Sequence, residues 1–164
     1  MSIRKSLALL AGVAVALPAG AASTSDATLD LSLEELMSVV VTSVSRKSQS
    51  LGQTAAAVHV IQAEDIRRSG ATSIPEALRL APGVQVSAIG QNKWAVSIRG
   101  FADRFSNKLL VMVDGRSVYS PLFSGVLWEA LDVPLENIAR IEVVRGPGAS
   151  IWGANAVNGV VNII

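Results

Sequence analysis

A glycine-rich segment near the C-terminus has some of the residue types that bind phosphate. Gly146-Pro147-Gly148 is followed by small residues and by two further glycines, Gly153 and Gly159. A phosphate-binding loop needs free backbone N–H groups at the start of a helix and often a lysine. Pro147 has no N–H, no lysine follows it, and the segment continues into β-branched residues. The pattern therefore argues against nucleotide binding.

No group of side chains has the spacing of a catalytic or metal centre. His59 is the single histidine, lies in a pattern typical of a strand, and has no cysteine near it because the chain contains none. A zinc site takes three or four such ligands. Glu129 and Asp132 show no spacing typical of a catalytic acid and base, so we expect them on solvated faces. We expect no catalytic residues, no metal and no cofactor, and we do not expect an enzyme.

The first 21 residues have the organisation of a secretory signal peptide. Arg4 and Lys5 form a positive region, residues 7–17 are apolar, and Ala19-Gly20-Ala21 supplies small residues for cleavage. The apolar run is about half of the roughly 20 residues that span a bilayer, which argues against a membrane anchor. We expect a mature N-terminus at Ala22 or Ser23.

Composition limits the remaining chain to one ordinary exported domain. Removing 21 of the 164 residues leaves 143, a size typical of a single domain. The same cleavage leaves 12 basic and 13 acidic residues, so nucleic acid is not an expected partner. The absence of cysteine excludes disulfides and a lipidated N-terminus.

Residues 22–50 form a segment of loose composition that we expect to be flexible. Its first part, residues 29–37, has the pattern of a short amphipathic helix with Ser32 and Glu35 as a capping box. A β-branched run follows, comprising Val39, Val40, Val41, Thr42 and Ser43. The run has two interpretations: an ordinary edge strand, or a strand left unpaired so that another protein adds it to a sheet.

From residue 51 onward the chain has the pattern of an α+β domain. Alternating or continuous β-branched residues predict strands over 57–61, 84–87, 95–99, 109–113 and 141–144. Asp114-Gly115 predicts a hairpin turn into a return strand at 118–119. Helices are expected over 63–68, over 74–81 after a Ser73–Glu76 capping box, and as a turn at 135–139. We predict a small globular domain with a mixed, roughly four-stranded sheet and two or three short helices.

Six short motifs occur in the order found in one receptor family. They are Val60-Ile61 with Glu64-Asp65-Ile66, Pro75-Glu76-Ala77-Leu78 with Pro82-Gly83-Val84, Ser97-Ile98-Arg99-Gly100-Phe101, Val113-Asp114-Gly115, Ile141-Glu142-Val143-Val144-Arg145-Gly146-Pro147, and the run from Trp152 to Val160. Each is weak alone, but six in order after a signal peptide are specific. Residues 51–164 resemble the plug domain of TonB-dependent outer-membrane receptors. Gln62 departs from the pattern, because Ser or Thr is a better N-cap.

The resemblance implies a ligand-gating plug of an active transporter in the outer membrane. Receptors of this family take up scarce ligands, commonly ferric siderophores or cobalamin-like compounds, with energy delivered through TonB. The implied partners are the C-terminal domain of TonB, which would grip Val39–Ser43, a small-molecule or metal-chelate ligand, and a surrounding β-barrel that this sequence does not contain.

The resemblance also implies roles for loop residues and for two arginines. The outward loops of the plug would present Gln91, Asn92, Lys93, Trp94, Arg104, Tyr119 and Phe123 to a ligand. Arg99 and Arg145 each end an apolar strand pattern and precede glycine, which is consistent with a charge in water. The family instead implies that both face the barrel wall and pair with its carboxylates, since buried guanidinium groups need such partners.

Two other functions stay open from the sequence. One is a stand-alone periplasmic binding module, and the other is a truncated receptor fragment without an independent role. In the absence of a barrel, residues 157–164 are β-prone, nearly uncharged and free of proline, which is typical of an exposed edge that pairs with other chains. We therefore expect a marginally stable chain that self-associates through this tail.

Overall fold

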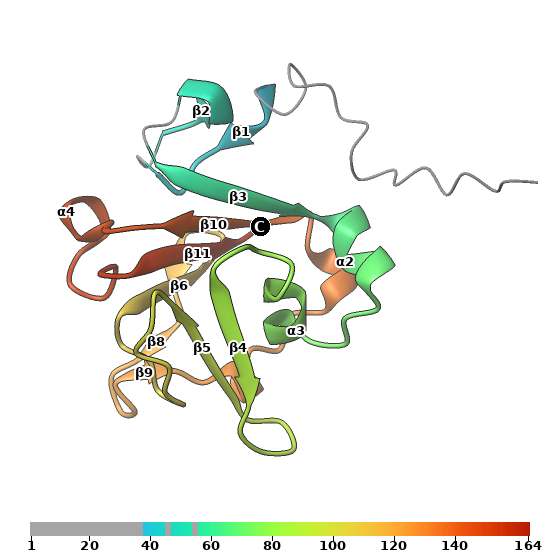
Figure 1. Cartoon of the computed structure of the whole chain (residues 1–164), viewed down its shortest axis with the longest axis vertical. Coiled ribbons are helices and arrows are strands. Elements are labelled where there is room, and N and C mark those ends of the chain that lie inside the picture. The colour runs from blue at the N-terminus through green and yellow to red at the C-terminus, as the bar shows by residue number, and fades with distance from the viewer. Residues whose placement is uncertain (1–37, 45–46, 54–55) are drawn as a thin grey trace, which may run out of the picture. The chain divides into compact units, whose positions relative to one another are not determined.

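The computed structural model describes residues 38–44, 47–53 and 56–164 (Figure 1). The predicted signal peptide, the predicted helix over residues 29–37 and its capping pair lie outside the described residues. Within the described ranges, no helix is long and apolar enough to cross a membrane. The described part combines a mixed sheet with short helices, as the sequence predicted.

A five-stranded mixed sheet organises the domain (Figure 1). Its strands are, in spatial order, β3 (Ala57–Gln62), β10 (Arg140–Arg145), β11 (Gly159–Ile163), β6 (Leu109–Val113) and β7 (Arg116–Ser117). β10 is antiparallel to both β3 and β11, whereas β11 is parallel to β6. The sheet thus has four longer strands and one two-residue strand, which agrees with the predicted mixed sheet of roughly four strands.

β11 occupies the centre of this sheet. All five of its residues are buried, and it hydrogen-bonds to β10 on one side and to β6 on the other. The prediction that residues 157–164 form an exposed, self-associating edge is therefore wrong. A continuous β-branched run is typical of a central strand covered on both faces, and the sequence pattern does not distinguish that strand from a free edge.

One face of the sheet carries the larger hydrophobic core. The strand residues pack against α2 (Ala63–Ser69), α3 (Ile74–Leu78) and the hairpin of β4 (Val84–Ala88) and β5 (Trp94–Ile98). The predicted apolar face of α3 and the residues after it is confirmed, because its members are all buried: Ile74, Ala77, Leu78 and Ala81. This face fixes the position of the β4–β5 hairpin.

The opposite face carries a second, smaller core. Its buried members are Leu110, Met112, Val144, Ala156 and Val160. The cover comes from distant parts of the chain. Val44 of the N-terminal segment, Ala56 and Val58 around the start of β3, and Trp152 of α4 (Ala149–Trp152) pack against these residues. In the N-terminal segment, β1 (Val40–Val41) and β2 (Gln49–Ser50) form a short antiparallel ladder, and η1 (Leu51–Gln53) leads to β3.

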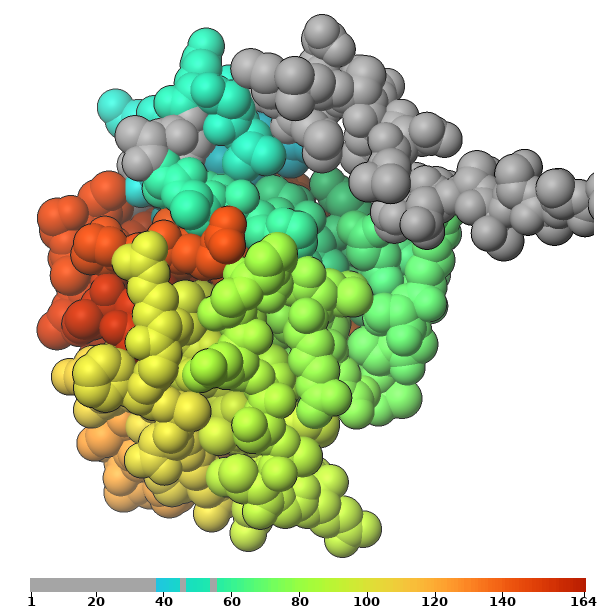
Figure 2. All heavy atoms as spheres, in the orientation of Figure 1, coloured from blue at the N-terminus to red at the C-terminus, as the bar shows by residue number. Residues whose placement is uncertain are grey.

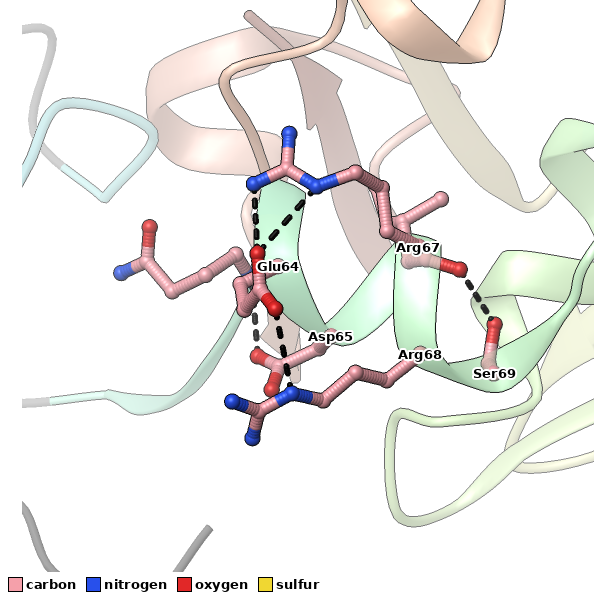
Figure 3. Close-up of polar contacts among 7 residues, drawn as sticks. Glu64, Asp65, Arg67, Arg68 and Ser69 are labelled. Atoms are coloured by element: carbon pink, nitrogen blue, oxygen red, sulfur yellow. Dashed lines mark hydrogen bonds and ion pairs between the residues drawn. The ribbon is translucent and has the colours of Figure 1, made fainter. Parts of the chain in front are cut away.

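The turns have the backbone geometry that their residues favour. Asp114 and Gly115 adopt φ angles of 47° and 76° between β6 and β7, as a tight hairpin requires. At α2, the backbone N–H of Gln62 donates to Asp65 Oδ2 at 3.0 Å, and Figure 3 shows Asp65 on the first turn of this helix. Gly70 ends the helix with a φ of 68°. Gln62 therefore serves as the N-cap although it is not a preferred residue, because Asp65 satisfies its N–H.

The start of α3 differs from the predicted capping box. The Ser73 hydroxyl makes no capping hydrogen bond. The Glu76 carboxylate instead accepts hydrogen bonds from the Thr72 N–H at 2.8 Å and from the Thr72 hydroxyl at 2.7 Å. These bonds, led by the backbone one, lower the pKa of Glu76. The helix also ends at Leu78 rather than residue 81, and Pro82-Gly83 follows shortly after.

The remaining elements are short and lie between β7 and β10. They are β8 (Tyr119–Ser120), which pairs with β9 (Gly125–Val126), and the 3-10 helices η2 (Trp128–Ala130) and η3 (Leu135–Asn137). The return strand predicted at 118–119 begins earlier, as β7 at Arg116–Ser117; Val118 lies in no strand, and Tyr119 begins β8, which pairs with β9 instead of β6. The predicted helical turn at 135–139 is confirmed as η3.

Candidate functional site

The first candidate site is the β-branched segment Val39–Ser43. Val40 pairs with Ser50 and Val41 with Gln49, and the Leu51 N–H donates to the Val39 carbonyl at 2.8 Å. Val41 and Ser43 are each 1% exposed, whereas Val40 is 50% exposed. In this structure only Val40–Val41 of the segment form a paired strand, and only Val41 and Ser43 are buried. The short ladder is compatible with the first of the two interpretations. Its contact with TonB stays a prediction.

Two side chains hold the residues that follow β1. Glu142 Oε2 accepts the backbone N–H groups of Thr42 and Ser43, each at 3.0 Å, and also the Ser43 hydroxyl. The Trp152 indole N–H donates to the Ser43 carbonyl oxygen at 2.7 Å. Neither Glu142 nor Trp152 is a predicted site residue. The sequence does contain one indication of the role of Glu142: it is a carboxylate inside an apolar strand pattern, and carboxylates are rarely buried unless they are paired.

The second candidate site is the group of loops expected to face a ligand. Gln91, Asn92 and Lys93 are exposed in the turn between β4 and β5, and Figure 2 shows this turn protruding from the surface. Trp94 begins β5 and is half-buried. The Arg79 guanidinium lies 5.7 Å from the centre of the Trp94 ring, within the range of a cation–π contact.

Arg104 and Phe123 take part in contacts with neighbouring side chains, whereas Tyr119 lies in a short ladder. Arg104 forms a 2.7 Å ion pair with Glu129, and this hydrogen bond is the main cause that lowers the pKa of Glu129. Phe123 stacks on Phe105 with ring centres 5.4 Å apart. Tyr119 is paired with Val126 between β8 and β9. Each of these three residues thus has its own partner within the domain. Their contact with a ligand stays a prediction.

A cavity of about 650 Å³ connects part of this group with α2 and α3. It brings Asn92 and Trp94 together with Glu129, the partner of Arg104, and it does not include Tyr119 or Phe123. Its other lining residues are mainly those of the α2–α3 connection and of residues 131–136. The cavity combines two tryptophan rings with carboxylates and an amide, which is a chemistry suited to a small polar molecule.

Arg145 is the last residue of β10, as the sequence predicted, whereas Arg99 directly follows β5, which ends at Ile98. Arg99 is exposed and adopts a φ of 59°, an uncommon backbone conformation for a residue with a side chain. Arg145 is half-buried, and its NH1 group donates to the Pro82 carbonyl at 3.3 Å. Arg145 Nε is buried and has no hydrogen-bond partner within the part of the chain that the structure describes.

His59 lies in β3 and is partly buried. Burial lowers the pKa of His59 from its ordinary value of 6.5, the positive charge of Arg145 lowers it further, and Asp65 acts in the opposite direction. Among the described residues, no group of three or more histidine, cysteine, aspartate or glutamate side chains is placed to hold a metal ion.

The topology and the order of these motifs agree with one known family. Residues 50–160 match the TonB-dependent Receptor Plug Domain. The chain belongs to this family. The vitamin B12 transporter BtuB of Vibrio vulnificus (strain CMCP6) is 35% identical to the plug over 127 residues, covering 76% of this chain and 20% of the transporter. The plug therefore spans about a fifth of the length of that relative.

A second relative is named as an outer-membrane protein. An iron-regulated outer membrane virulence protein of Vibrio cholerae serotype O1 (strain ATCC 39315 / El Tor Inaba N16961) is 35% identical to the plug over 122 residues, covering 71% of this chain and 18% of that protein. These named relatives are a transporter and an outer-membrane protein rather than enzymes.

Solved receptor structures contain the same fold. The ferripyoverdine receptor of the Pseudomonas aeruginosa outer membrane, bound to ferripyoverdine, aligns with a TM-score of 0.64 and 20% identity over 77% of this chain and 16% of the receptor. At that identity the likeness concerns the fold. A variant of the ferric enterobactin receptor PfeA from Pseudomonas aeruginosa, in complex with enterobactin, aligns with a TM-score of 0.51 and 31% identity, covering 68% of this chain and 18% of the receptor.

Proposed function

We propose that the plug gates ligand entry in a TonB-dependent active transporter of the outer membrane. The observation that carries this proposal is the 35% identity over 127 residues to a named vitamin B12 transporter. The mechanism is conformational rather than catalytic. Ligand binds the outward loops, the N-terminal segment becomes available, TonB grips it, and the plug shifts.

The proposed ligand is a scarce small molecule or metal chelate, such as a ferric siderophore or a cobalamin-like compound. Support comes from the relatives, one named for vitamin B12 transport and another solved in complex with enterobactin. The exposed amides and Lys93 of the β4–β5 turn, together with the neighbouring cavity, offer hydrogen-bond donors beside aromatic rings. This combination suits a polar ligand with a ring system.

The proposed partner of Arg99 and Arg145 is the inner wall of a surrounding barrel. Arg145 supports this proposal because its buried Nε has no partner among the described residues. A barrel carboxylate placed there would satisfy that donor and neutralise the charge. Arg99 lies at the end of β5 and is exposed, so it is accessible to a wall.

The proposed contact with TonB is addition of Val39–Ser43 as a strand to the C-terminal domain of TonB. Because backbone hydrogen bonds would supply most of the affinity, side-chain changes are expected to be tolerated better than proline. In a pull-down with that domain, Val41→Pro should abolish binding and Val41→Thr should retain it. Equal binding by the two variants would count against strand addition.

Transport itself is tested in cells. A full-length receptor that carries this plug is expressed in bacteria without their own receptor, with and without TonB, and uptake of labelled cobalamin or ferric siderophore is measured. We expect uptake of one ligand class only when TonB is present. Equal uptake without TonB would reject the proposal. N-terminal sequencing of the exported chain tests the proposed signal peptide, and an intact Met1 would reject it.

A further inference from the structure

A second cavity lies at one end of the five-stranded sheet. Its volume is about 700 Å³, which is in the range of pockets that hold small molecules. It shares no residue with the cavity beside the ligand-facing loops. Its lining includes Asp114, Arg140, Trp152 and Asn162, so charged and polar groups surround a space that nothing described so far explains.

The sheet places the polar residues of this cavity on the face of the second, smaller core. Asn162 in β11 lies opposite Glu142 in β10, and Arg140 precedes Glu142 by two residues. These three side chains therefore share a face, since alternate residues of a strand point to the same side. Val144 and Val160 follow the same alternation and belong to the second core. The core thus occupies one half of this face, and the cavity lies at the other half.

Asn162 is a buried amide, 5% exposed, in an otherwise apolar strand. Its Oδ1 accepts the Gly115 N–H at 3.1 Å, and this donor identifies which amide atom is the oxygen. Within the described residues, the amide nitrogen has no hydrogen-bond partner. It is also not enclosed, because the enclosed side-chain atoms without a partner there belong to Ser73, Arg104 and Arg145. Its two N–H groups are therefore available to a molecule in the cavity.

Arg140 supplies further donors at the same side of the cavity. Its Nε donates to Glu142 Oε1 at 2.9 Å, and its side chain is 27% exposed. Neither of its two terminal nitrogens has a partner in the part of the chain that the structure describes, and neither is enclosed. Two neighbouring guanidinium nitrogens suit a carboxylate, which accepts two parallel hydrogen bonds from them.

Asp114 lies across the end of β11 from Arg140. The backbone of Ile164 is hydrogen-bonded to that of Arg140, and the Asp114 N–H donates to the Ile163 carbonyl. The two residues therefore start roughly 10 Å apart, twice the spacing of neighbouring strands. Asp114 is exposed, and among the described residues its carboxylate has no hydrogen bond or ion pair. The cavity thus has donors at one side and a free carboxylate at the other.

The charges around the cavity favour a molecule that carries both signs. Arg140 and Glu142 form an ion pair and neutralise each other, so Asp114 is the remaining charge. Asp114 would repel a simple anion. A simple cation would bind Asp114 but would use none of the donors of Arg140 and Asn162.

We propose that this cavity binds a small zwitterion with a carboxylate and an ammonium group, such as a free α-amino acid. The carboxylate accepts hydrogen bonds from Arg140 and Asn162, and the ammonium group donates to Asp114. The indole N–H of Trp152 already donates to the Ser43 carbonyl, so Trp152 offers its ring surface to an apolar side chain. This site does not depend on the proposed transport function.

Titration of the whole 164-residue chain with L-leucine, followed by NMR, tests the site. The reporting signals are the Gly115 N–H and the side-chain amide of Asn162. Two further probes each lack one charge of leucine: 3-methylbutylamine has no carboxylate, and 4-methylpentanoate has no ammonium group. We expect leucine to bind at least about tenfold more tightly than either, since each lost charged contact costs about that factor. Equal binding of the three probes, or no shift of the reporting signals, would overturn the proposal.

Asp114→Asn tests the position of the ammonium group. Asparagine tolerates the φ of 47° at this turn, so the substitution removes the charge and keeps the backbone. We expect leucine to bind about tenfold more weakly and 4-methylpentanoate to bind more tightly, because the repulsion is gone. A loss of affinity for both probes would indicate a distorted turn and would overturn the role of Asp114.

Asp103→Asn is the matched control. Asp103 is also an exposed loop aspartate, and it lies outside the cavity. Its Oδ1 accepts the Arg104 N–H, a bond that an asparagine oxygen can also form. Leucine binding should stay unchanged. A loss equal to that of Asp114→Asn would show that net charge, and not this site, controls the affinity.

Asn162→Asp tests the carboxylate end. The substitution keeps an acceptor for the Gly115 N–H and replaces the free NH₂ group by an oxygen. We expect weaker binding of leucine and of 4-methylpentanoate, and no loss for 3-methylbutylamine. An unchanged affinity for leucine would overturn the role of Asn162. If this variant does not fold, Asp114→Asn with its control still decides the proposal.

Discussion

The backbone N–H of Gln62 donates to the carboxylate of Asp65 at the point where β3 becomes α2, over a distance of 3.0 Å. Figure 3 shows Asp65 and its neighbour Glu64 side by side on this helix, with different partners. Glu64 accepts hydrogen bonds from Arg67 and Arg68 on the exposed surface, at 2.6 and 3.1 Å. Of these two adjacent carboxylates, Asp65 thus caps the helix, whereas Glu64 forms ion pairs on the solvent-exposed surface.

This difference predicts opposite outcomes for two neighbouring substitutions. Asp65→Ala leaves the Gln62 N–H without its acceptor at a helix N-terminus, which should lower the free energy of unfolding by about 1 kcal/mol. Glu64→Ala should leave it within experimental error, since exposed ion pairs contribute little. Urea unfolding of both variants measures the comparison. A larger loss for Glu64→Ala would show that the surface network, not the cap, stabilises α2.

Gly159 is expected to tolerate no side chain. A Cβ atom there would lie 2.5 Å from the Val144 carbonyl oxygen and 2.9 Å from Ile98 Cδ1. Gly159→Ala should therefore lower the free energy of unfolding by about 3 kcal/mol. Gly70→Ala is the control, because Gly70 has a φ of 68° and open space around it, and it should lose only about 1 kcal/mol. Equal losses would contradict the close strand contact.

His59 predicts a loss of stability in mild acid. Its pKa in the folded protein is lowered, mainly by burial and then by Arg145, so below pH 6.5 the unfolded chain takes up a proton more readily than the folded one. The stabilising contribution is complete above 6.5 and declines as the pH falls through the lowered pKa. We expect the urea midpoint to fall less between pH 7.5 and 5.5 in His59→Gln than in the original chain. Identical declines would assign the effect to other groups.

The outward loops predict a graded effect on uptake. In a full-length receptor, Lys93→Ala should reduce uptake at limiting ligand by about tenfold if it loses one charged contact, and Tyr119→Ala should also weaken uptake. Arg104→Ala also breaks the ion pair between Arg104 and Glu129. Glu129→Gln is therefore the control, because it removes the charge of the partner and leaves Arg104 in place. Arg68→Ala on the exposed surface of α2 should have no effect. Unchanged uptake in all three loop variants would reject these residues as ligand contacts.

Local patterns predicted most of the elements in this domain. The alternation in residues 84–87, the helical spacing from Ile74 to Ala81, and the Asp114-Gly115 turn each depend on neighbours in sequence, and each occurs as expected. The cap of α3 followed the pattern only in part, because the Ser73 hydroxyl makes no capping hydrogen bond and the hydroxyl that Glu76 accepts is that of Thr72. Thr72 and Ser73 both carry a hydroxyl, so residue types alone do not predict which of the two bonds at the start of the helix.

The incorrect and missed predictions depend on contacts between distant parts of the chain. The β11 run is apolar and β-branched in either a central or an edge strand, and only its pairing with both β10 and β6 decides between them. Glu142 gains its role from Thr42 and Ser43, about a hundred residues away. No spacing rule within one segment connects these residues, although a carboxylate in an apolar strand does indicate that some partner must exist.

The central position of β11 has a consequence for when the domain folds. Residues 159–163 supply the partner for both β10 and β6, and β3 pairs only with β10, whose residues follow it by about eighty positions. During synthesis from the N-terminus, β3 therefore emerges long before β10, and β6 emerges long before β11, although β7 follows β6 directly. Such non-local pairing delays folding. The five-stranded sheet can therefore close only after residues 159–163 have been made, because β11 joins its two halves.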